Sequence, residues 1–196
     1  VVALDLSPAQ LACLELRVPG LHTVYNALGA LGTGLELSVP AEQALTSLSH
    51  YQPVFGRWSC LRRGETTVQV NLAKNPASMN QSLRTVRAAP GEKALVFILN
   101  DNIADGRDTT WIWDIDMEQL LPEAEIIVTS GTRRHEMALR LKYASVPQQR
   151  IQTVPDLPSA LELLERRRLR TVYLLPNYTA LKDVRRMLAT WEAVAQ

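Results

Sequence analysis

The feature that most constrains the fold of this chain is an unbroken apolar run at residues 94–99. A run of strand length with no polar position is typical of a strand that is buried on both faces of a sheet. Shorter apolar or alternating segments predict further strands at residues 67–72, 125–128, 151–154 and 172–175. Helical spacing of apolar residues predicts helices at residues 76–86, 136–144, 158–167 and 181–194. This alternation predicts an α/β fold, with a Rossmann-like, mostly parallel sheet flanked by helices, over residues 56–196.

The first part of the chain has a different pattern. A short strand or edge is predicted at residues 1–6, followed by a turn at Ser7-Pro8 and a second apolar stretch at residues 11–18. Apolar residues then recur at helical spacing as far as Gly32 and Gly34, and Pro40 marks the start of a second helix. We expect residues 1–55 to form a small helical unit without a sheet of its own, and residues 51–57 to act as the linker.

Composition argues against several classes of function. Lys and Arg number 21 against 20 Asp and Glu, and the charges are interspersed, so no nucleic-acid partner is predicted. No apolar run approaches the roughly 20 residues of a membrane-spanning helix, so no transmembrane segment is predicted. Cys13 and Cys60 match no zinc spacing, and the three histidines are isolated, so we expect no metal site within the chain.

The loop after the most apolar strand carries many charges. A parallel sheet places its functional loops beyond the carboxyl ends of its strands, which selects residues 73–78, 100–114 and 130–134. The charged residues of the second loop are Asp101, Asp105, Arg107 and Asp108. Such a loop is either solvated or offers its charges to a ligand or partner, and composition does not separate the two. Trp111 and Trp113 beside it favour the second interpretation, and we expect at least one of them to be a core anchor.

The other two loops carry weaker signals. Lys74 lies where a strand turns into a helix, where a lysine can hold a phosphate, although an exposed lysine beside Pro76 explains the pattern better. Ser130 or Thr132 can belong to a polar ligand loop or can cap a helix. The chain contains no Gly-Lys pair and therefore no phosphate loop of the G-x-x-x-x-G-K-[ST] type.

Several motifs resemble the Mur ligase family. The segment at residues 20–28 is similar to the helix that ends the central ATPase domain of these ligases, and Phe55-Gly56-Arg57 is similar to their domain junction. Residues 70–76 resemble the first strand and turn of their C-terminal domain. Closer matches to the MurT branch of the family lie at residues 75–81, 100–114, 140–143 and 177–181. The resemblance covers the chain from about residue 16 onward.

The resemblance implies a nucleotide site for ATP and Mg²⁺. Asn26 would lie near the adenine and Arg57 near the ribose or phosphates. Asn71 stands where many Mur ligases have a ribose-binding aspartate, Lys74 would approach the γ-phosphate, and Asn75 belongs to the same turn. The phosphate loop and the four-cysteine zinc insertion of the family would both lie upstream of residue 1. Residues 1–55 would then be the end of the central domain and residues 56–196 the C-terminal domain, and such a piece alone would be inactive.

The MurT branch also implies a reaction and a partner. Its members amidate the α-carboxylate of D-glutamate in the stem peptide of lipid II, using ATP and ammonia that a GatD-type glutamine amidotransferase releases from glutamine. The setting would be bacterial and cytoplasmic, at the inner face of the membrane. An aspartate of the 101–108 loop would orient the histidine of the partner, with Asp108 the first choice and Asp105 the second. Two alternatives stay open: another Mur-like ATP-dependent amide ligase, and a non-catalytic α/β docking module.

Overall fold

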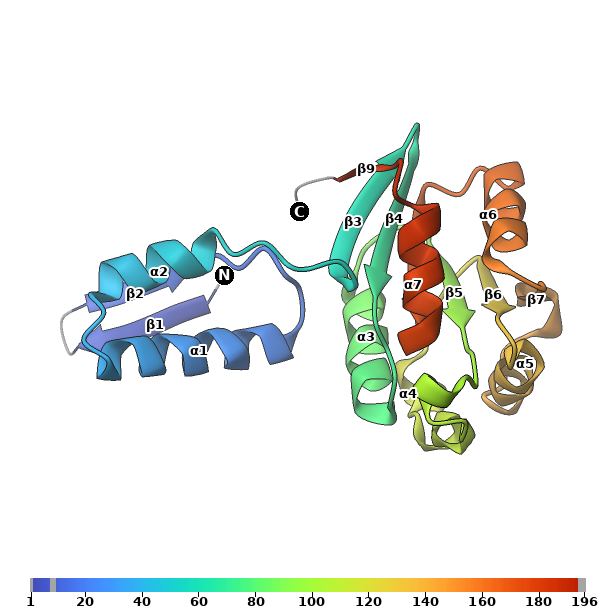
Figure 1. Cartoon of the computed structure of the whole chain (residues 1–196), viewed down its shortest axis with the longest axis horizontal. Helices are drawn as coiled ribbons and strands as arrows, with labels where there is room; N and C mark the ends of the chain where they lie inside the picture. The colour runs from blue at the N-terminus through green and yellow to red at the C-terminus, as the bar shows by residue number, and fades with distance from the viewer. Residues whose placement is uncertain (1, 8–9, 194–196) are drawn as a thin grey trace. The chain divides into compact units, whose positions relative to one another are not determined.

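The computed structural model describes residues 2–7 and 10–193 of the chain, with side chains described from residue 14 to residue 191 (Figure 1). Within it the chain divides into two compact units, the first ending at Val54 and the second beginning at Phe55. The second unit contains the parallel sheet.

The first unit has a hairpin as well as two helices. Strand β1 (Val2–Ser7) pairs antiparallel with β2 (Gln10–Leu14), and helices α1 (Leu21–Glu36) and α2 (Ala41–Ser49) follow. The buried core joins Leu14 of β2 to Ala27 and Leu31 of α1. The prediction of a unit without a sheet is therefore wrong, because β1 and β2 form a two-stranded sheet and Leu14 at its end packs with helix α1. Of the predicted Ser7-Pro8 turn, Pro8 lies outside the described residues.

Helix α1 also runs farther than the sequence predicts. It continues through both glycines to Glu36. Gly32 is exposed, and a glycine there costs the helix only about 1 kcal/mol relative to alanine. Packing of Ala27 and Leu31 in the core outweighs that cost. The second helix begins just after Pro40, as predicted.

The second unit is built on a seven-stranded sheet with the order β7-β6-β5-β8-β4-β3-β9. Its strands are β3 (Arg57–Arg63), β4 (Thr66–Asn71), β5 (Ala94–Ile98), β6 (Ile126–Ser130), β7 (Ile151–Thr153), β8 (Thr171–Pro176) and β9 (Glu192–Ala193). The pairs from β7 to β4 are all parallel, and β3 pairs antiparallel with both β4 and β9. The predicted α/β fold with a mostly parallel sheet is confirmed.

Helices cover both faces of this sheet. They are α3 (Pro76–Ala88), α4 (Met117–Leu120), α5 (Arg134–Tyr143), α6 (Leu157–Arg166) and α7 (Tyr178–Met187). On one face, alternate strand residues such as Val96 and Val128 form a core with Ala160 of α6 and Val184 of α7. Helices α3 and α5 contact β8, β5 and β6. All five residues of β5 are buried, as the apolar run predicts.

Two edge elements differ from the sequence-based expectation. The linker predicted at residues 51–57 ends inside β3, whose buried residues are only Trp58 and Leu61. The helix predicted to reach residue 194 ends at Met187, after which Trp191 is buried in the core and β9 pairs with β3. Residue 194 itself lies outside the described residues. Strand β3 buries only two of its seven residues and β9 has only two residues, so neither gives a periodic apolar signal, which explains both differences.

None of the described helices is long and apolar enough to cross a membrane.

Candidate functional site

The candidate site lies where the loops after β5 and β8 meet. Strands β5 and β8 are neighbours in the sheet. The chain runs from β5 to β6 on one side of this pair and from β8 to β9 on the other side, so the direction of the connections reverses between them. Asn177 joins the two loops: its Oδ1 accepts from the backbone N–H of Asn100 at 3.2 Å, and its Nδ2 donates to the Asn100 carbonyl at 2.7 Å. The backbone N–H of Asn177 also donates to the carbonyl of Ile98 at 3.0 Å. The acidic loop, residues 101–108, therefore begins next to a residue that is held by hydrogen bonds on both sides of its peptide unit.

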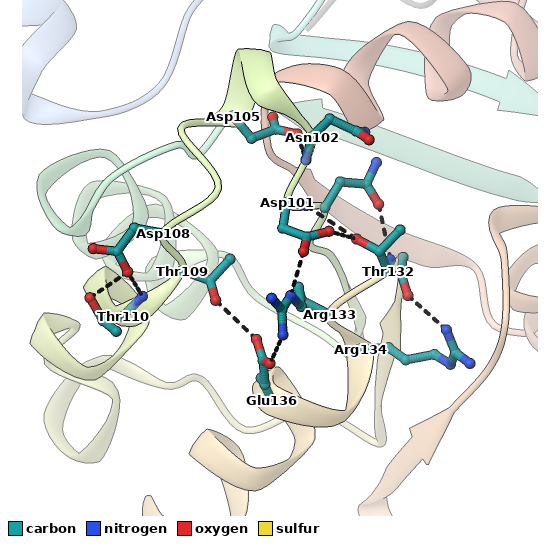
Figure 2. A network of polar contacts seen from close by, with 12 residues as sticks. Asp101, Asn102, Asp105, Asp108, Thr109, Thr110, Thr132, Arg133, Arg134 and Glu136 are labelled. Carbon is teal, nitrogen blue, oxygen red and sulfur yellow. Dashed lines mark hydrogen bonds and ion pairs between the residues drawn. The ribbon is translucent and has the colours of Figure 1, made fainter.

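Asp101, the first acid of the loop, is tied to the turn after β6 (Figure 2). Its Oδ1 accepts from Thr132 Oγ1 at 2.7 Å and its Oδ2 from Arg133 Nε at 2.7 Å. The hydrogen bonds from Thr132 and Arg133 lower the pKa of Asp101 below its ordinary value. Arg133 also pairs with Glu136. Asp101 is therefore held by the two side chains of that turn.

Asp105, the second acid, caps helix α7. Its Oδ1 accepts from the backbone N–H of Thr179 at 2.9 Å, and its Oδ2 accepts from Thr179 Oγ1 at 2.5 Å. Oδ2 also accepts from the backbone N–H of Asn102 at 3.2 Å. Asn177, the residue before the helix, makes no side-chain cap of its own. Asp105 therefore fills the capping position from a distant part of the chain, beside the positive end of the helix dipole.

Asp108, the third acid, is exposed and only half engaged (Figure 2). Its Oδ1 accepts from the backbone N–H of Thr110 at 2.8 Å and from Thr110 Oγ1 at 2.7 Å. Its Oδ2 has no hydrogen bond from the described residues. The hydroxyl and then the amide of Thr110 lower the pKa of Asp108 below its ordinary value. Asp108 is therefore an oriented carboxylate with one oxygen available.

The backbone before Asp108 is sharply turned. Gly106 has φ 90° and Arg107 has φ 55°, two consecutive residues in the left-handed region. For a residue with a side chain, such as Arg107, this conformation costs roughly 1–2 kcal/mol. The backbone N–H of Asp108 donates to the Gly106 carbonyl at 2.6 Å, which closes the turn. This turn lies between Asp108 and the two acids, Asp101 and Asp105, that make hydrogen bonds with other parts of the fold.

A buried arginine holds the segment that follows the acidic loop. Arg140 of α5 is 3% exposed, and its Nε and Nη2 donate to the carbonyls of Ile112 and Ile115 at 3.1 and 2.7 Å. The same guanidinium binds both carboxylate oxygens of Glu118, at 2.6 and 2.9 Å. The hydrogen bond from Arg140 lowers the pKa of Glu118 to about 2. This clamp fixes the 3₁₀ helix Thr110–Asp114 that follows Asp108.

The two tryptophans of that 3₁₀ helix are not core anchors, contrary to expectation. Ile112 between them is the buried residue, at 1% exposure, while Trp113 is 46% exposed and Trp111 is half-buried. The Trp113 ring packs edge to face on Tyr143, with centroids 5.5 Å apart. In a 3₁₀ helix neighbouring side chains point about a third of a turn apart, so only one of three adjacent residues faces the core.

The nucleotide residues inferred from resemblance lie in different surroundings. Asn75 is the N-cap of α3, with Oδ1 accepting from the Ser78 backbone at 2.8 Å. Asn71, at the end of β4, is buried and donates to Ser82 Oγ at 2.8 Å. Arg57 lies opposite Asn71 in the β3–β4 pair and is exposed. Both asparagines are thus partly occupied by contacts within the fold.

Lys74 and Asn26 complete the set. Lys74 is exposed and lines a cavity of about 190 Å³ together with Asp105, Trp111 and Tyr178. The structure thus brings Lys74 and the acidic loop to the same depression. Asn26 is exposed on α1, one residue before the buried Ala27, and belongs to the first unit.

Residue-by-residue inference missed the groups that organise the site. Thr179 and Asn177 lie 74 and 77 positions from the loop residues that they bind. The available signals for Asn177 were its place two positions after the predicted strand at residues 172–175 and its place in the segment 177–181, which resembles the MurT branch. Arg140 had no signal that marked it as buried, because an arginine at helical spacing is usually exposed.

Comparison with known proteins gives a consistent group of matches. A family model described as MurT ligase C-terminal matches residues 72–181. The subunit MurT of the lipid II isoglutaminyl synthase (glutamine-hydrolyzing) from Streptococcus pneumoniae strain R6 is 32% identical over 183 residues, covering 91% of this chain and 40% of that protein. The MurT subunit from Staphylococcus aureus strain COL is 41% identical over 133 residues, covering 67% of this chain and 30% of that protein. The chain spans less than half the length of these relatives.

Solved structures of two ligases share the fold. MurF from Acinetobacter baumannii has a TM-score of 0.70 at 21% identity, covering 93% of this chain and 40% of that chain. Folylpolyglutamate synthase from Mycobacterium tuberculosis, solved with ADP and AMPPCP, has a TM-score of 0.69 at 17% identity, covering 93% of this chain and 43% of that chain. At such identities the likeness concerns the fold alone.

Proposed function

Since the chain belongs to the MurT ligase C-terminal family, we propose that it forms the C-terminal part of the ligase-like subunit of a lipid II isoglutaminyl synthase. The complete enzyme would amidate the α-carboxylate of D-glutamate in the stem peptide of lipid II during peptidoglycan synthesis. ATP would convert that carboxylate to an acyl phosphate, and ammonia would displace phosphate to give the amide. A GatD-type glutamine amidotransferase would supply the ammonia from glutamine.

The observation that carries this proposal for the chain itself is the state of Asp108. Its Oδ1 is fixed by Thr110, and its Oδ2 accepts no hydrogen bond within the described part of the chain. The hydrogen bonds from Thr110 lower its pKa, and an aspartate is ionised at neutral pH even at its ordinary pKa. A fixed, ionised and exposed carboxylate can accept a hydrogen bond from an imidazole and stabilise its charged form.

We propose that Asp108 acts in this way on a histidine of the glutaminase partner. The histidine would accept the proton of the cysteine thiol that attacks glutamine, and the carboxylate would fix its tautomer. Asp105 is the weaker candidate, because both of its oxygens are occupied at the N-terminus of α7. Asp101 is excluded from the role for the same reason, since Thr132 and Arg133 occupy its oxygens.

We propose a subsidiary role for Lys74 towards the γ-phosphate of ATP. Its ammonium is exposed beside the small cavity that Asp105 and Trp111 also line. A lysine in that position next to the helix α3 N-terminus would meet phosphate oxygens. Within the second unit, Arg57 and Asn71 would contribute on the nucleotide side, with Asn75 in the Lys74 turn. No ligand for Mg²⁺ is assigned to residues of this chain.

The test uses the complete ligase subunit assembled with its glutaminase. Asp108→Asn keeps an oxygen for Thr110 but removes the charge, so release of glutamate from glutamine should fall at least about a hundredfold. Complex formation, measured by analytical ultracentrifugation, and ATP binding should be unchanged. Asp116→Asn is the matched control, because Asp116 is an exposed aspartate bound to Asn80 and lies outside the acidic loop.

An unchanged glutaminase rate for Asp108→Asn would remove Asp108 from the mechanism. Asp105→Asn would then be examined in the same assay. If both variants hydrolyse glutamine at the rate of the unmodified complex, the loop has a structural role and the proposed contact with the partner is wrong.

A further inference from the structure

A second and larger cavity lies on the other side of the loop junction. Its volume is about 610 Å³, within the roughly 300–1,000 Å³ of small-molecule sites. It opens beyond the carboxyl ends of β5 and β6, between α6 and α7. Its apolar lining includes Ile98, Leu157, Ala180, Val184 and Met187. Asn100 and Asn102 of the loop junction line it, whereas Lys74, Asp105 and Asp108 do not.

Ser130 is an unpaired polar group in this cavity. Alternation along β6 places Ile126 and Val128 in the core beneath α6 and α7, and Ser130 continues the same face at the end of the strand. Its side chain is fully buried, and Oγ has no hydrogen-bond partner among the described residues. A buried hydroxyl without a partner costs free energy that an alanine would avoid. A bound ligand atom in the cavity would satisfy it.

Arg134 supplies unused donors to the same cavity. It is half-buried, and only its Nη1 is engaged, donating to the carbonyl of Gly131 at 3.0 Å. Its Nε and Nη2 have no partner in the part of the chain that the structure describes. Arg186 of α7 lines the cavity too and makes a single 3.4 Å contact with Asp183. Guanidinium groups with free N–H donors favour oxyanions.

The turn between Ser130 and Arg134 is rigid. Gly131 has φ 92°, and a Cβ there would meet the Leu99 carbonyl oxygen at 2.4 Å, so only glycine fits. The backbone N–H of Thr132 donates to Asn100 Oδ1 at 3.1 Å, and that of Arg133 donates to the Leu99 carbonyl at 2.9 Å. The hydroxyl and the guanidinium are therefore held on one stiff segment before any ligand arrives, as a binding site requires.

We propose that this cavity binds a small molecule with an oxyanion group, carboxylate or phosphate, on an apolar body. Arg134 donates to the oxyanion, and Ser130 Oγ makes a hydrogen bond to the same group. The apolar body packs on Leu157 and Val184. Two acids also line the cavity, Asp156, which caps α6, and Asp183, which pairs with Arg186. The site is independent of the glutaminase contact at Asp108.

The experiment titrates the 196-residue chain, without ATP or any partner, with hexanoate, hexyl phosphate and hexanol. Dissociation constants are measured from protein NMR chemical shifts of Ser130, Gly131 and the Val184 methyl groups. At least one of the two anions should bind about fivefold or more tightly than the alcohol, and the tighter anion identifies the oxyanion. Ser130→Ala and Arg134→Met should each weaken that anion about fivefold. Hexanol binding should change little.

Arg185→Met is the matched control, an exposed arginine of α7 that does not line the cavity. The Arg185→Met chain should bind the two anions as tightly as the unmodified chain does. The proposal is overturned if hexanol binds as tightly as both anions, or if the shifts at Ser130 and Val184 do not move. Arg134 is half-exposed, so Arg134→Met keeps the test decisive even if Ser130→Ala perturbs folding. Unweakened binding of the anions to Arg134→Met also overturns the proposal.

Discussion

Asp105 and Asp108 are three residues apart and have opposite surroundings. Asp105 is half-buried and holds the N-terminus of α7 with both oxygens. Asp108 is exposed and keeps one oxygen free of contacts within the described residues. The same residue type therefore stabilises the fold at one position and is available for recognition at the other, which gives the two positions separable phenotypes.

Asp105→Ala should lower the free energy of unfolding by about 1–2 kcal/mol, because it removes the cap of α7 and its favourable charge. Urea denaturation of the chain measures this loss. Asp108→Asn is the control and should leave the midpoint nearly unchanged, since asparagine still accepts from Thr110. If Asp105→Ala is as stable as the unmodified chain, the cap contributes nothing to stability. Asp105 would then again be a candidate for contact with the partner.

At the scale of elements, the segment after Asp108 depends on one clamp. Arg140 joins the carbonyls of Ile112 and Ile115 to the carboxylate of Glu118. Helices α3 and α5 pack against this 3₁₀ helix, and Arg140 belongs to the second of them. The position of the acidic loop is therefore sensitive to the charge of Glu118.

The clamp predicts a pH dependence. The pKa of Glu118 is about 2 in the folded chain and near its ordinary value of 4.5 when unfolded. A depressed folded pKa adds stability that is complete above about pH 4.5 and is lost as the pH falls towards 2. Glu118→Gln should therefore have a lower free energy of unfolding than the unmodified chain at pH 7. This difference in free energy should become smaller between pH 4.5 and 2.

Urea denaturation at pH 7, 4.5 and 3 measures this gap. Glu162→Gln is the control, because the ion pair of Glu162 with Arg166 is exposed at both ends. A gap for Glu118→Gln that stays constant across this range would mean that the carboxylate is not held as the clamp requires.

The elements that sequence reasoning found are those with strong internal periodicity. The strand at residues 94–99 and the helix after Pro76 were predicted because apolar residues alone define them. Strands β3 and β9 were missed because most of β3 is not buried and β9 is two residues long, so neither has an apolar pattern of its own. The acidic loop was found as a segment, but separating Asp105 from Asp108 required Thr179, which is far away in sequence.

At the scale of the whole molecule, the two units differ in the size of their cores. The first buries Leu14, Ala27 and Leu31, whereas the second buries residues from all of its central strands. Small cores leave little stability after the entropy of folding. We expect amide hydrogen exchange of α1 to be faster than that of β5, and a chain starting at residue 56 to unfold cooperatively. Equal protection of α1 and β5 would contradict this.

We also expect the 196-residue chain to bind ATP only weakly. It has no G-x-x-x-x-G-K-[ST] loop, and Lys74 and Arg57 provide a few exposed contacts in its place. Isothermal titration with ATP and Mg²⁺ tests this, and Lys74→Met should reduce whatever affinity remains. A sub-micromolar dissociation constant would show that the chain holds the nucleotide without such a loop.

Both borders of the seven-stranded sheet end in very short strands, β7 with three residues and β9 with two. Unpaired backbone groups along a sheet border invite pairing with another chain, and short strands leave few of them. The two residues of β9 cover part of β3, which is seven residues long and would otherwise be the border. The segment after α7 therefore serves solubility: losing it would uncover a strand that can template aggregation.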